Sequence, residues 1–133
     1  MTQEENAMKF DQLITFSIRS APFGAVLVAI VIAILSLLPG SDLPSQNIND
    51  KLSHFIAYAA LSFLAVLARR KIPLVHMIVL AVGYGIALEV LQGVMPYGRS
   101  ASWLDALANM GGVLFGAAAG MCLHRWSRRF GKV

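Results

Sequence analysis

The sequence predicts an all-α fold, a polytopic membrane bundle of four transmembrane helices with both termini in the cytoplasm. First, 57% of the 133 residues are hydrophobic and 14% are charged, whereas a soluble domain is about 25% charged. Second, the apolar residues form four runs, each long enough to cross a hydrocarbon core of about 30 Å. Third, the positions of Lys and Arg set an orientation. The predicted helices span about 21–38, 51–68, 73–93 and 103–123.

The first predicted helix follows a polar segment, residues 1–20, which we expect to lie in the cytoplasm. This segment contains Glu4, Glu5 and Asp11, unlike the short basic start of a secretory signal. The apolar run after it is long and lacks a small-x-small cleavage site. We therefore expect residues 21–38 to form a retained membrane helix.

The connections between the helices carry turn and cap residues. PGSDLPSQNIND follows the first helix, RRK links the second to the third, and MPYGRS links the third to the fourth. Each helix is therefore expected to run antiparallel to the one before it. Residues 21–123 would form one membrane domain, followed by a basic cytoplasmic tail at 124–133.

Most basic residues fall on one side of this arrangement. Nine of the 11 Lys and Arg residues lie before the first helix, between the second and third, or after the fourth. These are Lys9, Arg19, Arg69, Arg70, Lys71, Arg125, Arg128, Arg129 and Lys132. The positive-inside rule then places both termini and the RRK turn in the cytoplasm. The basic tail is typical of attraction to anionic lipid, so we expect the lipid bilayer as its partner and no nucleic acid.

The same topology brings polar residues from three helices to one depth, the outer half of the bilayer. The second helix runs inward, the third outward and the fourth inward, so the start of one lies level with the end of another. The polar residues at this level are Asp50, Lys51, His54, Tyr58, Glu89, Gln92, Ser102, Asp105 and Asn109, and Arg99 lies in the loop above them.

Helical spacing turns these residues toward protein rather than lipid. On each helix the inner polar residues are three or four positions apart and share a face. Beyond Asp105 and Asn109, the glycines Gly112, Gly116 and Gly120 continue the same face. Small residues let helices approach closely in lipid. We expect this ridge to face the bundle, and it is also the candidate surface for a homo-oligomer.

The polar residues predict an outward-facing site for a lipid-linked or cell-envelope ligand at the outer leaflet. His54, Glu89 and Asp105 are the candidate catalytic residues, as general acid and base, because burial and proximity tune such groups. Lys51 and Arg99 would bind an anionic headgroup. The remaining candidates for substrate binding are Asp50, Tyr58, Gln92, Ser102 and Asn109.

Other interpretations use the same residues. The protein would be a non-enzymatic binder or carrier, or a structural membrane protein whose polar cluster only fixes helix packing, and the residues leave the question of catalysis open. A divalent metal on His54, Glu89 and Asp105 is less favoured, because neither HExxH nor CxxC spacing is present. No metal or other cofactor is therefore predicted, and the single Cys122 excludes an internal disulfide.

Two segments resemble a known family. DKLSHFIAYAALSFL resembles the Asp-Lys-x-x-His-Phe-x-x-Tyr segment of VanZ-like membrane proteins, and EVLQ with GRSASWLDALANMGGVLFG resembles their Glu-x-x-Gln … Arg … Asp-x-x-x-Asn-x-x-Gly segment. The resemblance covers about residues 30–120 and implies a multi-pass protein of the bacterial cytoplasmic (inner) membrane. The family is named for a protein that lowers susceptibility to teicoplanin, and its biochemical activity is unsettled. Resistance belongs to one branch and is not carried over to this chain.

Overall fold

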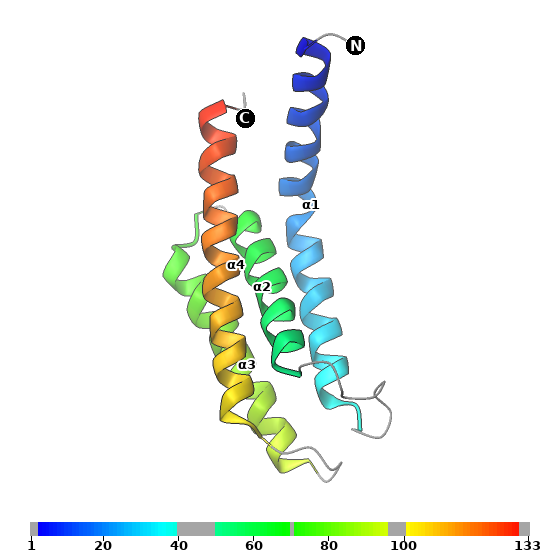
Figure 1. Ribbon diagram of the computed structural model, residues 1–133, viewed down its shortest axis with the longest axis vertical. Helices are drawn as coiled ribbons and strands as arrows, with labels where there is room; N and C mark the ends of the chain where they lie inside the picture. Colours follow the sequence, from blue (N-terminus) through cyan, green and yellow to red (C-terminus); the bar gives the residue numbers. More distant parts are fainter. Residues whose placement is uncertain (1–2, 40–49, 70, 96–100, 131–133) are drawn as a thin grey trace.

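The computed structural model describes residues 3–39, 50–69, 71–95 and 101–130, which form four helices and no strand (Figure 1). In chain order these are α1 (Gln3–Leu37), α2 (Asp50–Ala68), α3 (Leu74–Val94) and α4 (Trp103–Phe130). Each contains an apolar stretch long enough to cross a membrane. The prediction of an all-α bundle with four membrane-spanning helices is therefore confirmed.

The helices alternate in direction along the bundle. The first turns of α1 and the last turns of α4 lie at the same end of the molecule and extend there beyond the other two helices (Figure 1). The opposite end, which we call the distal end, is formed by the last turns of α1 and α3 and the first turns of α2 and α4. This arrangement agrees with the predicted pair of hairpins. The side of the membrane that each end faces stays a prediction.

The outer helices are longer than the sequence analysis predicted, while α2 and α3 agree within one residue. α1 begins at Gln3 instead of about residue 21, and α4 ends at Phe130 instead of about 123. The added parts contain no Gly or Pro to stop a helix. Their apolar spans are shorter, Thr15–Leu37 and Trp103–Ser127, so apolar composition marks the span and not the helix. The division into N-terminal segment, membrane domain and tail stays a prediction.

The outer surface of the helices carries large apolar side chains. Phe23 is 80% exposed, Leu80 66% and Phe115 62%. A water-soluble protein rarely exposes a continuous apolar surface of this kind, whereas lipid tails solvate it. The surface therefore fits a bundle surrounded by hydrocarbon.

The most extensive helix contact is between α2 and α4, and small residues make it possible. A methyl group added to Gly112 or Gly116 would collide with the backbone carbonyl of Phe55 or Ala59. The glycine ridge therefore faces the bundle, as predicted. Since α2 already covers it, this structure leaves the ridge unavailable to a second copy, and the expected homo-oligomer stays a prediction without an assigned surface.

Candidate functional site

His54 is the centre of the polar residues at the distal end. It lies one turn into α2, and its side chain is 11% exposed. Its Nδ1 atom is 3.0 Å from the Asn109 side-chain oxygen on α4 and 4.0 Å from Glu89 Oε1 on α3. Its Nε2 atom is 3.8 Å from Asp50 Oδ1, one turn earlier on α2. One imidazole therefore faces polar groups from three helices.

The contact with Asn109 assigns the proton on the imidazole. The carboxamide oxygen of Asn109 only accepts hydrogen bonds, so Nδ1–H of His54 is the donor. In the neutral ring this leaves Nε2 as an acceptor with its lone pair directed toward Asp50. This lone pair and the carboxylate of Asp50 are both able to bind a cation.

Glu89 is tied to the start of α4. It is 6% exposed, and its Oε2 accepts a hydrogen bond from the backbone N–H of Ser102 at 3.2 Å. The Ser102 hydroxyl in turn accepts from the N–H of Asp105 at 3.3 Å, as an N-cap residue does. In a capping box the residue at the third helical position would accept from the cap's N–H. Here α3 supplies that acceptor, so Glu89 fixes where α4 begins.

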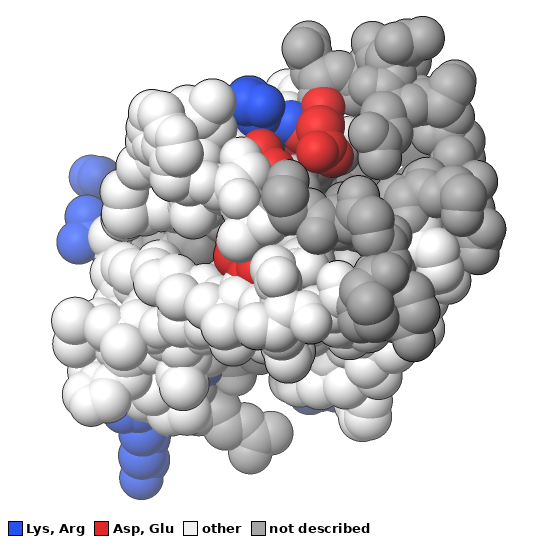
Figure 2. Space-filling view, turned by 90° about the horizontal axis from the view of Figure 1, so that it is seen from below, with Lys and Arg blue, Asp and Glu red and all other residues white. Residues whose placement is uncertain are grey.

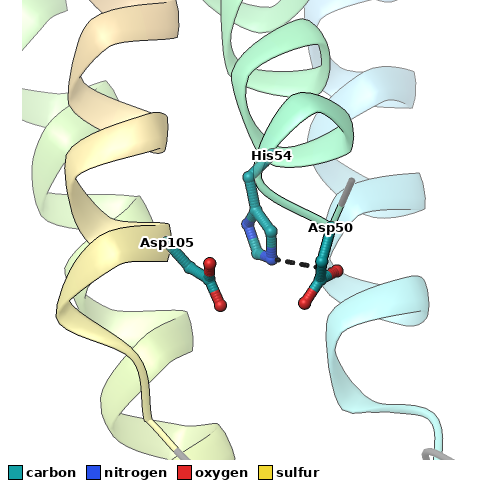
Figure 3. A group of neighbouring side chains, drawn as sticks. All are labelled: Asp50, His54 and Asp105. Carbon is teal, nitrogen blue, oxygen red and sulfur yellow. Dashed lines mark ion pairs between the residues drawn. The ribbon is translucent and has the colours of Figure 1, made fainter. Parts of the chain in front are cut away.

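Asp105 is buried but incompletely satisfied. The residue is 8% exposed, and its Oδ1 accepts no hydrogen bond from the described residues. Lys51 Nζ lies 3.6 Å from this oxygen, and its side chain is 55% exposed. In Figure 3 the carboxylate of Asp105 on α4 faces His54 and Asp50 on α2. A buried carboxylate oxygen without a donor costs stability, and it needs a reason.

The polar cluster, which we define as Asp50, Lys51, His54, Glu89, Ser102, Asp105 and Asn109, carries an excess of negative charge. Among these residues there are three carboxylates and one ammonium group. Seen from the distal end, acidic atoms lie beside basic atoms in one part of the face. Further acidic atoms lie near the centre of the face (Figure 2). Arg99 lies outside the described residues, so the structure does not place its charge.

Two predicted site residues, Tyr58 and Gln92, lie outside the polar cluster and pack against other parts of the bundle. Tyr58 is 1% exposed and lies one turn below His54, with its ring 6.3 Å from that of Tyr84. A methyl group on Gly85 would lie 3.1 Å from the Tyr58 ring and 3.4 Å from the Asn109 side chain. Tyr58 therefore packs in the core of the bundle, directly beneath the polar cluster.

Gln92 turns away from the cluster toward α1. Its Nε2 donates to the backbone carbonyl of Ser36 at 2.9 Å. About two turns earlier on α3, the Tyr84 hydroxyl donates to the carbonyl of Ala29 at 2.6 Å. Both bonds join α3 to α1. The sequence analysis did not identify these partners, because a backbone carbonyl leaves no signal in residue type.

One comparison with known proteins found a match. The family model VanZ/LLP1 matches residues 3–124, which include every residue of the polar cluster. No curated protein and no solved structure matches the chain.

Proposed function

The chain belongs to the VanZ/LLP1 family, and we propose that its polar cluster binds the polar headgroup of a lipid-linked or cell-envelope ligand. In this proposal the protein is a multi-pass protein of the bacterial cytoplasmic membrane. Its termini lie in the cytoplasm, and its distal end faces the outer leaflet. The resemblance in the segments around His54 and Asp105 supports this placement.

The charge distribution supports the orientation. Arg69 and Lys71 lie at the end of the bundle that holds the termini, while Lys51 lies at the distal end. Cytoplasmic loops are the ones enriched in Lys and Arg. The test uses a Cys122→Ala background in which Ser45→Cys or Tyr97→Cys is labelled by a membrane-impermeant thiol reagent on intact cells. Labelling from outside supports the proposal, and labelling only after lysis contradicts it.

The observation that carries the ligand proposal is the buried Asp105 Oδ1 without a hydrogen-bond donor among the described residues. Ionisable groups within a membrane helix cost about 2.5–3.5 kcal/mol at the helix centre on insertion scales. A cluster that served only packing would recover that cost by pairing each buried oxygen. Asp105 leaves an acceptor next to His54, and a polar ligand group would satisfy it.

The chemistry on offer is hydrogen bonding, charge pairing and proton exchange. Lys51 is half-exposed and would reach an anionic headgroup. His54 presents Nε2 on the side of Asp50, so it would accept a proton from a ligand or return one. Whether that exchange makes the protein a catalyst or a binder is decided by the fate of the ligand.

The test compares lipids from cells and from the purified protein. Lipids that co-purify with the wild-type chain are identified by mass spectrometry beside Asp105→Asn, Glu89→Gln and His54→Ala variants. Gly83→Ala is the matched control, because a methyl group there would meet nothing within 4 Å. We expect a lipid species that is retained by the wild type and the control and lost from the three variants.

Three outcomes separate the alternatives. A lipid altered in cells that express the wild type, but not the His54→Ala variant, indicates an enzyme. A lipid that is retained without change indicates a binding or carrier protein. Equal lipid profiles for wild type and well-folded variants would contradict the proposal and leave the structural interpretation.

A further inference from the structure

Three side chains of the polar cluster converge in a way that the headgroup proposal does not require. Asp50, His54 and Asp105 each direct one potential ligand atom into a common space, and these atoms all lie within 4.8 Å of one another. Figure 3 shows Asp50 and His54 on α2 facing Asp105 across from α4. We propose that these three residues bind a divalent transition-metal ion that bridges α2 and α4.

The donor set has the composition of a metal site. It combines one imidazole with two carboxylates, the ligands that zinc and manganese accept in proteins. Asp50 and His54 are four residues apart on one helix face, which points both side chains to the same side. A bound ion about 2.1 Å from each donor separates neighbouring donors by roughly 3–3.5 Å. Small side-chain rotations would close the present spacing, and Asp50, whose side chain is 46% exposed, is free to make one.

The surroundings of His54 prepare its nitrogen for a metal. Metal-binding histidines usually donate their other ring N–H to a fixed acceptor, which sets the tautomer and the ring orientation. Asn109 is that acceptor at Nδ1, so Nε2 keeps its lone pair on the side of Asp50. Asn109 is thus a positioning residue for the ion.

Asp105 supplies the second observation that points to a cation. Its residue is 8% exposed, and its Oδ1 is buried without a hydrogen-bond donor among the described residues. Lys51 approaches this oxygen only to 3.6 Å, so its ammonium group is a weak partner that a divalent ion would displace. The metal and Lys51 therefore compete for Asp105.

The sequence analysis considered a metal on His54, Glu89 and Asp105 and did not favour it, because neither HExxH nor CxxC spacing is present. The structure commits Glu89 Oε2 to the N–H of Ser102 and puts Asp50 in its place, through a one-turn spacing on α2. A three-ligand ion has open positions for water or a substrate oxygen. It would also cancel the excess negative charge of the cluster, which would otherwise repel an anionic headgroup, a consequence that rests on the proposed function.

The experiment measures metal binding without any lipid ligand. The full chain is purified, treated with chelator, and titrated with Zn²⁺ by calorimetry and with Co²⁺ by visible absorption. We expect one ion per chain, with a Co²⁺ spectrum of low coordination number. Asp105→Asn and His54→Ala should each weaken Zn²⁺ binding at least tenfold. Asp50→Asn should do the same from an exposed position where folding is not at risk.

Two further variants distinguish this site from adventitious binding. Lys51→Gln should strengthen Zn²⁺ binding several-fold because the competing ammonium is gone, whereas His76→Ala, an exposed histidine far from the cluster, should change nothing. Glu89→Gln should lose the lipid ligand yet retain the metal, so the two proposals can fail separately. Absence of stoichiometric binding, or equal affinity in the wild type and Asp50→Asn, would overturn the metal site.

Discussion

The interface between α2 and α4 has two parts that follow the same helix faces but are held differently. In the glycine part, Gly112, Gly116 and Gly120 approach the backbone of α2 without any polar side chain. In the polar part, His54 contacts Asn109 and Lys51 approaches Asp105. The glycine part depends on the lack of side chains, which lets the two backbones approach closely. The polar part depends on hydrogen-bonding and charged groups. Added volume should therefore break one, and lost polarity the other.

The largest effect is expected in the glycine part, from Gly116→Ala. The new methyl group would collide with the Ala59 carbonyl and its neighbouring backbone atoms, which cannot rotate away as a side chain can. Overpacking costs about 1–3 kcal/mol when side chains yield, and we expect the upper end or more here. The measurement is the yield of monodisperse protein and the free energy of unfolding in mixed micelles.

Gly83→Ala is the matched control for this prediction. It makes the same chemical change on α3, where a methyl group would meet nothing within 4 Å, and Ala has the higher helix propensity. This variant should match or slightly exceed the wild type in stability. Equal losses for the two variants would mean that close packing of α2 on α4 is not what the ridge provides.

The polar part should lose about 2 kcal/mol in Asn109→Ala. His54 Nδ1–H then loses its acceptor at 3.0 Å and keeps only Glu89 Oε1 at 4.0 Å, beyond hydrogen-bond distance, and an unsatisfied buried donor costs about 1–3 kcal/mol. A double-mutant cycle with His54→Ala isolates the contact. We expect a coupling energy of about 1 kcal/mol, in line with hydrogen bonds inside membrane proteins. Strictly additive losses would show that the two side chains do not stabilise each other.

The two parts also differ in how well the sequence predicts them. Topology and helical spacing were sufficient to bring His54, Asn109, Asp105 and Glu89 together, because antiparallel helices of membrane length align residues by depth. The glycine ridge was likewise assigned to the bundle. What the sequence does not specify is the exact pairing: Glu89 caps α4 through a backbone N–H, and this contact depends on tertiary geometry.

The bonds between α3 and α1 were hidden for a related reason. Tyr84 and Gln92 donate to backbone carbonyls of α1, and every residue carries a carbonyl. The extra length of α1 and α4 was also not predicted from the sequence. The prediction relied on hydropathy, which detects the membrane-spanning part of a helix and not the polar turns that continue it. Sequence reasoning therefore predicted which polar residues lie close together better than it predicted the contacts that support them.

A smaller effect is expected from Tyr84→Phe, which tests a polar contact outside the interface of α2 and α4. The hydroxyl donates to the Ala29 carbonyl at 2.6 Å, but that carbonyl lies within α1 and has a second lone pair for its helical bond. The change removes a donor and leaves no buried group unpaired, so we expect a loss of about 1 kcal/mol. Unfolding in mixed micelles measures it. A loss as large as that of Asn109→Ala would mean that α3 depends on this bond for its position.

The smallest effect on stability is expected from Lys51→Gln. The Lys51 side chain is 55% exposed and its ammonium is 3.6 Å from Asp105, so solvent screens the pair and about 0.5 kcal/mol is expected. Asp105 also follows the Ser102 cap, where the start of α4 favours a negative charge without help from Lys51. Unfolding at low and high salt should give a small difference between variant and wild type that decreases as salt is added, because salt screens an exposed ion pair. A loss above about 2 kcal/mol would place the pair among buried ion pairs and would make Lys51, not a metal, the cation on which Asp105 depends.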